Sequence, residues 1–171
     1  CVDRITGKKE IYERYLVEDE KEFENILKNN YKKVFWEGWP EVEVLYFDIK
    51  KRIKSKEKNI CVPDGVLLWL GKTIKASEIY VIEYKVSGHT HEHIFNQLRK
   101  FKNALDNAES RKSIIDSITE ELGSNKKYQK IWQSQIGKLS FYKGCSDLME
   151  SFPGTIVVVD EYNDKMKALV K

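Results

Sequence analysis

Two strongly apolar runs lie close together in the chain and constrain its fold more than any other feature. Val62 to Leu70 and Glu78 to Lys85 are rich in valine, isoleucine, leucine and aromatic residues, and Gly71-Lys72 lies between them. Runs of this length and composition favour β-strands, and a short turn between two strands favours an antiparallel pair. We therefore expect a chain built around a β-sheet that contains this hairpin.

The second apolar run ends in two opposite charges, Glu83 and Lys85. Side chains alternate between the faces of a strand, so these two project from the same face. The first run begins with Pro63-Asp64, and an antiparallel hairpin can place Asp64 beside Glu83. An unpaired charge is expensive to bury. Either these charges lie beyond the edge of the sheet in water, or the fold holds them for a chemical purpose.

The rest of the chain alternates between helical and strand patterns. Asp19 and Glu22 have the spacing of a capping box at the start of the first helix. We expect a loop in the lysine-rich segment after residue 49, helices over residues 18–30, 91–107, 111–122 and 127–139, strands over 42–49 and 154–160, and a short helix after residue 160. We expect the strand over 154–160 to be buried. This order predicts a mixed α/β domain with a central mixed sheet flanked by helices.

The chain of 171 residues has the length and the 41% hydrophobic content of one globular domain, residues 1–171. It opens on Cys1 rather than methionine, so we expect a domain cut from a longer protein, with partner domains outside it. The three cysteines are widely spaced and form no CxxC pair, which argues against a disulfide scaffold or a structural zinc site. This favours a reducing compartment such as the cytoplasm. The apolar runs are too short for a membrane helix, so no membrane partner is expected.

Basic residues cluster locally although the net charge is only +3. The clusters are Lys50–Lys58, Arg99–Lys102 and Lys126–Lys130. A small net charge does not by itself indicate nucleic acid, and solvated surface lysines are the alternative explanation. Trp36 and Trp39 flank Gly38 in a predicted turn, where an exposed ring would stack on a base.

Asp64, Glu83 and Lys85 together suggest metal-dependent hydrolysis. Two adjacent carboxylates raise each other's pKa unless a cation lies between them. Two oxygen ligands with room for water suit Mg²⁺ or Mn²⁺. A lysine beside such an ion can orient or deprotonate a water for attack on phosphorus.

These residues resemble the motif of the PD-(D/E)xK nuclease superfamily, which has a restriction-endonuclease-like fold. The matching residues are Pro63-Asp64 and Glu83-Tyr84-Lys85. The resemblance implies that Asp64, Glu83 and the backbone carbonyl of Tyr84 bind the metal, while Lys85 assists the nucleophilic water. It also implies hydrolysis of phosphodiester bonds, in DNA more than in RNA. It covers roughly residues 18 to 105.

Two helical features extend the resemblance. "QLRKF", Gln97 to Phe101, is similar to the QhxxY motif of RecB-like members, with Phe101 in place of tyrosine. We expect Gln97 to face the metal site; a surface glutamine is the alternative. On the first helix, a helical wheel places Glu20 on the apolar stripe and Glu24 on its flank. Many members carry an acid there, so Glu20 is our first choice of ligand and Glu24 the second. The alternative is a glutamate that serves only the helix dipole.

Several alternatives stay open. "EYKVS", Glu83 to Ser87, is also similar to cap-snatching RNA endonucleases, but many of those use a histidine from an N-terminal helix and none precedes His89 here. A second alternative is a catalytically inactive nucleic-acid-binding or assembly module, and a homodimer is also compatible with the sequence. His89, His91 and His93 would line one face of an extended segment and suit zinc, although Gly88 and Thr90 favour a loop that leads into a helix.

Overall fold

The computed structural model describes residues 17–36, 41–50, 52–54, 60–86, 91–151 and 153–160. Its helices are α1 (Glu20–Trp36), α2 (His91–Leu105), α3 (Ala108–Ser124), α4 (Lys126–Gln135) and α5 (Phe141–Glu150). Its strands are β1 (Glu43–Phe47), β2 (Ile53–Lys54), β3 (Ile60–Cys61), β4 (Gly65–Leu70), β5 (Glu78–Lys85) and β6 (Gly154–Val159). None of the helices in these ranges is long and apolar enough to cross a membrane.

The hairpin predicted from the two apolar runs is present as β4 and β5, which pair antiparallel. The connection between them is longer than a two-residue turn and contains a short 3-10 helix, η1 (Ile74–Ala76). The Ser77 hydroxyl fastens this connection: it donates to the carbonyl of Thr73 and accepts from the N–H of Gly71. Strand β4 begins at Gly65, three residues after the predicted start at Val62.

The hairpin forms the centre of a four-stranded sheet with the order β1-β4-β5-β6. β1 pairs antiparallel with β4, whereas β6 returns after four helices and pairs parallel with β5. The prediction of a mixed sheet flanked by helices is therefore confirmed.

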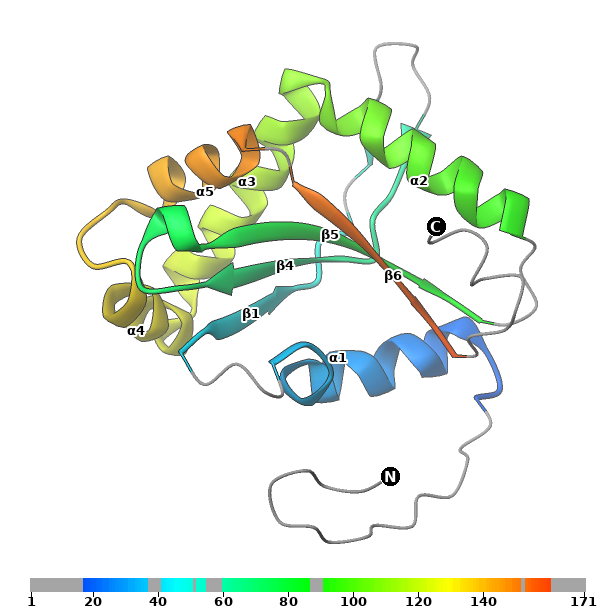
Figure 1. Cartoon of the computed structure of the whole chain (residues 1–171), viewed down its shortest axis with the longest axis horizontal. Coiled ribbons are helices and arrows are strands. Elements are labelled where there is room, and N and C mark those ends of the chain that lie inside the picture. The colour runs from blue at the N-terminus through cyan, green and yellow to red at the C-terminus, as the bar shows by residue number, and fades with distance from the viewer. Residues whose placement is uncertain are drawn as a thin grey trace, which may run out of the picture.

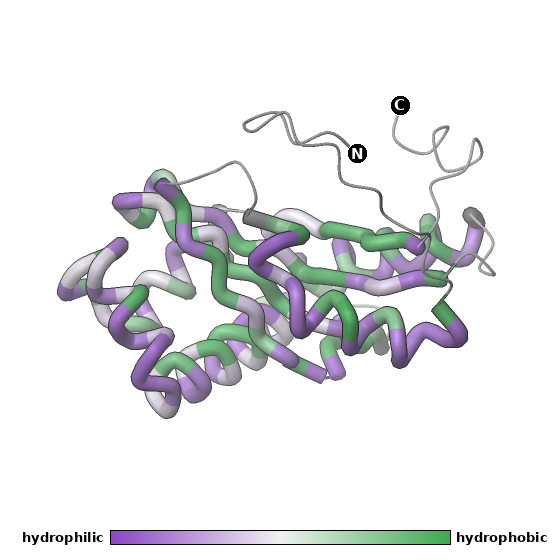
Figure 2. The backbone as a smooth tube through the Cα atoms, turned by 90° about the horizontal axis from the view of Figure 1, so that it is seen from below, coloured by the Kyte–Doolittle hydropathy of each residue, from purple (hydrophilic) through white to green (hydrophobic). Residues whose placement is uncertain are grey.

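Helices cover both faces of the sheet, with α1 on one face and α2 to α5 on the other (Figure 1). The strands are the most continuously hydrophobic parts of the chain, and hydrophilic and hydrophobic residues alternate along the helices (Figure 2). Alternation along the strands supplies both faces. The α1 side buries Phe23, Leu27, Val44, Tyr46, Leu67, Ile82 and Tyr84. The larger core on the other side includes Leu45, Phe47, Val66, Leu68, Val81, Phe101, Ile114, Trp132 and Leu148.

Several predicted elements need correction. The predicted loop after residue 49 contains the small hairpin of β2 and β3. The strand over residues 154–160 was predicted to be buried, but all six residues of β6 are partly exposed because β6 lies at the edge of the sheet. The helix predicted after residue 160 lies outside the described residues.

Helix α5 lies in a part of the chain for which no element was predicted, and Gly144 near its middle disfavours a helix. The structure explains this glycine: a Cβ at position 144 would lie 2.5 Å from the ring of Trp132. The Trp132 ring is 1% exposed and packs edge-on against Phe141 at the start of α5. Close packing of a tryptophan has therefore overridden the local helix propensity.

Gly65 provides a test of packing at the start of β4. A Cβ at this position would lie 2.4 Å from the hydroxyl oxygen of Tyr46. Because overpacking typically costs about 1–3 kcal/mol, we expect Gly65→Ala to lower the free energy of unfolding by that amount in urea titrations. Gly123→Ala is the matched control, since its Cβ meets nothing within 4 Å and lies in α3. The control should leave stability unchanged or raise it; equal losses in both variants would contradict this packing argument.

Candidate active site

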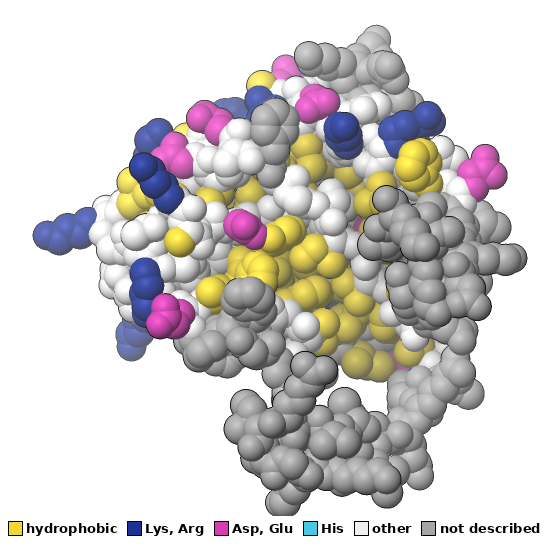
Figure 3. All heavy atoms as spheres, in the orientation of Figure 1, with side chains coloured by type: hydrophobic (Ala, Val, Ile, Leu, Met, Phe, Trp, Pro, Cys, Tyr) yellow, Lys and Arg dark blue, Asp and Glu magenta, His cyan; other side chains and the backbone are white. Residues whose placement is uncertain are grey.

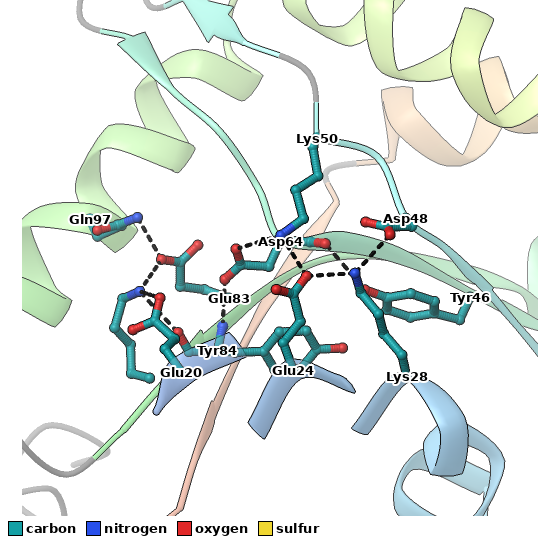
Figure 4. A network of polar contacts seen from close by, with 11 residues as sticks. Glu20, Glu24, Lys28, Tyr46, Asp48, Lys50, Asp64, Glu83, Tyr84 and Gln97 are labelled. Atoms are coloured by element: carbon teal, nitrogen blue, oxygen red, sulfur yellow. Dashed lines mark hydrogen bonds and ion pairs between the residues drawn. The ribbon is translucent and has the colours of Figure 1, made fainter. Parts of the chain in front are cut away.

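Asp64 is held beside β5 by two backbone hydrogen bonds. Its own N–H donates to the carbonyl of Ile82 at 3.1 Å, which continues the ladder of β4 and β5 by one residue. Its Oδ2 accepts from the N–H of Tyr84 at 2.8 Å. In addition, the Tyr46 hydroxyl donates to the Asp64 carbonyl at 3.1 Å. The hairpin thus brings Asp64 next to Glu83, as expected from an antiparallel pairing of the two apolar runs (Figure 4).

Glu83 is the most deeply buried acid of this group, with 2% of its surface exposed. Its Oε1 accepts from Lys85 Nζ at 2.7 Å and from Gln97 Nε2 at 2.5 Å. Its Oε2 is also buried and has no hydrogen-bond partner in the described part of the chain. Burial of an unsatisfied carboxylate oxygen is costly, so this oxygen is available to a ligand.

The Lys85 ammonium is enclosed by oxygen atoms. Nζ lies 2.7 Å from Glu83 Oε1, 2.9 Å from the carbonyl oxygen of Tyr84 and 3.0 Å from Glu20 Oε1. Its side chain is only 6% exposed. The three oxygens come from two elements, β5 and α1, so the ammonium ties the start of the first helix to the end of the central strand. Its single positive charge offsets one of the two negative charges that the flanking carboxylates can carry.

Burial raises the pKa of both carboxyl groups of the hairpin, whereas ion pairs determine the direction of the shift for Lys85. Burial raises the pKa of Glu83 to about 7, although the hydrogen bond from Lys85 opposes the shift. Burial likewise raises the pKa of Asp64, and the N–H of Tyr84 opposes that shift. For Lys85, burial would lower the pKa, but contacts with Glu83 and Glu20 outweigh it and raise the pKa above its usual value. Near neutral pH the protein therefore holds a charged lysine beside a carboxyl that is poised between its two forms.

The placement of the two α1 acids differs from the helical-wheel prediction. Glu24, predicted on the flank, has 11% of its side chain exposed, whereas Glu20, predicted on the core-facing stripe, has 38% exposed. Ile26, an apolar residue between Phe23 and Leu27, is exposed. The packed stripe is instead set by Phe23 and Leu27, one turn apart, which rotates the buried face towards Glu24. Glu20 nevertheless reaches the site because it begins the helix near the end of β5.

A second set of charges, which the sequence argument missed, adjoins Asp64. Glu24 Oε1 lies 2.6 Å from the ammonium groups of both Lys28 and Lys50. Lys50 also lies 4.0 Å from Asp64 Oδ1, and Lys28 pairs with Asp48 at 2.7 Å (Figure 4). Burial would raise the pKa of Glu24, but the two lysines outweigh it and lower the pKa. The spacing of Glu24 and Lys28, four residues apart on a helix, is the sequence signal for one of these pairs.

Helix α2 contributes Gln97 and Phe101. The structure brings the amide of Gln97 to Glu83 rather than leaving it on the surface. Phe101 is fully buried in the larger core, one helical turn beyond Gln97. A phenylalanine suits this position in the hydrophobic core, because it has no hydroxyl group that would need a hydrogen-bond partner there.

Other sequence candidates lie elsewhere. His91 and His93 belong to the first turn of α2, so the extended arrangement proposed for zinc is wrong; His89 lies outside the described residues. Arg99, Lys100 and Lys102 are exposed on α2, and Lys126, Lys127 and Lys130 are exposed on α4. Most of the cluster Lys50–Lys58 lies outside the described residues, as does Trp39. Cys61 and Cys145 are buried free thiols.

The donor atoms fit a hard divalent cation. The described residues contain no group of three or more histidine, cysteine, aspartate or glutamate side chains able to hold a metal. They do place Asp64 beside Glu83 (Figure 4), and Oε2 of Glu83 is buried without a hydrogen bond among these residues, while the Tyr84 carbonyl accepts from the neighbouring Lys85 ammonium. Mg²⁺ is commonly bound through one or two carboxylates while it retains several waters. The residues present therefore suit Mg²⁺ or Mn²⁺ rather than a zinc centre.

Comparison of the chain with protein-family models, with curated proteins and with solved structures found no match. What the site does must therefore be inferred from its own residues, contacts and charges.

The raised pKa of Glu83 predicts how stability depends on pH in EDTA. The folded carboxyl titrates near 7 and the unfolded one near 4.5, so folding retains a proton between these values. Stability from this group is present below pH 4.5 and is lost as the pH rises through 7. Because one pKa unit corresponds to about 1.4 kcal/mol, the stability difference between wild type and Glu83→Gln should fall by roughly 3 kcal/mol over that window. Urea titrations at several pH values measure it; a difference that grows with pH would contradict the assignment.

Proposed function

We propose that this protein is a metal-dependent nuclease of the PD-(D/E)xK type with a restriction-endonuclease-like core, which hydrolyses phosphodiester bonds, in DNA more readily than in RNA. The observation that carries the proposal is the convergence of Asp64, Glu83 and Lys85 at one end of a hairpin, with a buried Glu83 oxygen that lacks a partner. The order of elements supports it as well. Helix α1 is followed by the sheet strands β1, β4 and β5, then by four helices, and finally by β6, which pairs parallel with β5.

In this proposal Asp64 and Glu83 hold Mg²⁺ or Mn²⁺ together with the Tyr84 carbonyl, and Glu20 completes the site from α1. The ion would neutralise charge that develops on the phosphate and lower the pKa of a bound water. Lys85 orients the attacking water and can accept its proton only after it has itself lost one. Gln97 fixes the Glu83 carboxylate by its hydrogen bond, so it is a positioning residue rather than a catalytic one.

Metal binding and cleavage should depend on the two converging carboxylates. We expect Asp64→Asn and Glu83→Gln each to reduce Mn²⁺ affinity by more than tenfold in calorimetry and to abolish Mg²⁺-dependent cleavage while the protein stays folded. Single-stranded, duplex and branched DNA and RNA of matched sequence should be assayed side by side, and DNA should be cut faster. Asp116→Asn is the matched control, because Asp116 forms only an exposed ion pair with Lys112 on α3.

Each result of this experiment has a definite meaning. Cleavage that persists in EDTA with a metal-free protein would reject the proposed chemistry. Faster cleavage of RNA would favour the cap-snatching alternative. Nucleic-acid binding without Mn²⁺ binding or cleavage would favour the inactive binding module.

Lys85 should separate turnover from metal affinity. An ammonium is not a metal ligand, and Lys85 contacts three oxygens, all of which belong to the proposed ligands Glu83, Tyr84 and Glu20. We expect Lys85→Met to reduce turnover about 10²-fold or more, while Mn²⁺ affinity is retained or rises because the competing cation is gone. Calorimetry and single-turnover kinetics measure the two effects. Lys112→Met is the control, since Lys112 is exposed and distant in sequence from the site. Equal losses of affinity and rate would show that Lys85 mainly maintains the structure of the site.

A further inference from the structure

Strand β6 forms an open edge of the sheet. It pairs with β5 on one side, and on its other side no strand is present among the described residues. Every residue from Gly154 to Val159 remains partly exposed. Hydrophobic side chains gather in the middle of the face that carries β6 in Figure 1, as the space-filling view shows (Figure 3).

The opposite edge, β1, is closed by comparison. Four of its five residues are buried, and the first, Glu43, forms an ion pair with Lys32 of α1 at 2.9 Å. The backbone carbonyl of Tyr46 accepts a hydrogen bond from the Tyr128 hydroxyl of α4 at 3.0 Å. Helices α1 and α4 therefore both contact β1. Only one of the two sheet edges in the described part of the chain is protected in this way.

The composition of β6 gives it none of the usual defences of an edge strand. Its sequence, Gly-Thr-Ile-Val-Val-Val, contains no charged residue and no proline. Edge strands in natural proteins are commonly protected by lysine, proline, bulges or a covering element, because unpaired N–H and C=O groups otherwise recruit another strand. Among the described residues no element covers this six-residue uncharged edge, so it is suited to pairing with a strand of similar character.

We propose that β6 pairs antiparallel with β6 of a second copy of this chain, with the two-fold axis at Val157. In an edge strand every second residue directs both its N–H and its C=O outward. Two residues that form a hydrogen-bonded pair across the axis must both be of this kind, so their positions in the sequence differ by an even number. The axis therefore passes through a residue. An axis at Ile156 would bring Pro153, which has no N–H, opposite Val159, whereas an axis at Val157 uses only residues that can donate.

This register produces compatible neighbours. Ile156 lies opposite Val158 of the second copy, and Thr155 lies opposite Val159, so each direct pair has two β-branched side chains. Asp160 lies opposite Gly154, so the two aspartates sit at opposite ends of the paired strands and do not repel each other. The two four-stranded sheets become one, and rotation about an axis perpendicular to that sheet keeps both α1 helices on the same face.

Disulfide trapping tests the register directly. At the axis Val157 faces itself, with Cα atoms about 4.5–5.5 Å apart, within the range that a disulfide spans. In a Cys1→Ser background, Val157→Cys should form a covalent dimer under mild oxidation. Thr155→Cys is the matched control, because the two copies of residue 155 would be about 13 Å apart along the strands. Equal cross-linking of both variants, or none of Val157→Cys, would overturn the proposed register.

The oligomeric state tests the interface without a disulfide. Sedimentation equilibrium of the full chain should show a dimer that dissociates in Ile156→Lys and in Thr155→Lys, which place a charge on opposite faces of the paired strand. Ser151→Lys adds the same charge just outside β6 and should remain dimeric, and circular dichroism should show that all variants are folded. A monomer at every concentration would overturn the proposal. If such a monomer also has β6 amides that resist hydrogen exchange, another part of the same chain covers this edge.

Discussion

Glu83 and Lys85 lie in surroundings where neither would readily carry a charge alone. Removal of an isolated carboxylate or ammonium from water is opposed by desolvation, and here both are almost fully buried. For the Lys85 ammonium, contacts with three oxygens offset the cost of desolvation. For Glu83, the contacts with Lys85 and Gln97 offset part of that cost. One Glu83 oxygen remains without a hydrogen bond. A cation or a hydrogen-bond donor that contacts this oxygen would therefore stabilise the site.

The elements around the hairpin determine where the side chains of this site lie. The register of β4 and β5, in which Gly65 pairs with Ile82, brings Asp64 beside Glu83 (Figure 4), and the N–H of Tyr84 fixes the orientation of the Asp64 carboxylate. Helix α1 supplies Glu20 from one face of the sheet, and α2 supplies Gln97 from the other. Because Glu20, Glu83, Lys85 and Gln97 lie in regular elements and Asp64 directly precedes β4, the spacing of the polar atoms is tied to the packing of two apolar cores.

The sequence was sufficient to predict the parts of this structure that depend on local periodicity. Two apolar runs separated by a glycine predicted β4 and β5, and alternation along a strand predicted that Glu83 and Lys85 share a face. The helical wheel gave the wrong relative burial of Glu20 and Glu24, because it averages over a helix, whereas the buried face of α1 is set by where Phe23 and Leu27 meet the sheet. Helix α5 was missed because the packing of Trp132, distant from Gly144 in the sequence, decides that a glycine belongs there. Lys50 approaches Asp64 because β1, which precedes Lys50, pairs antiparallel with β4, and the pattern of residues around Lys50 alone does not encode this contact.

Tyr128 and Tyr46 form two successive links between helix α4 and the site. Tyr128 donates to the backbone of Tyr46, and the Tyr46 hydroxyl donates in turn to the backbone of Asp64. The residues that carry the motifs end near position 105, yet Asp64 is anchored by a residue that lies beyond them. In the same way β6, which follows all five helices, lies directly beside Glu83 in the sheet. The smallest fragment that preserves the geometry of this site therefore extends at least to β6, and a truncation designed around the motifs alone would separate the carboxylates from their support.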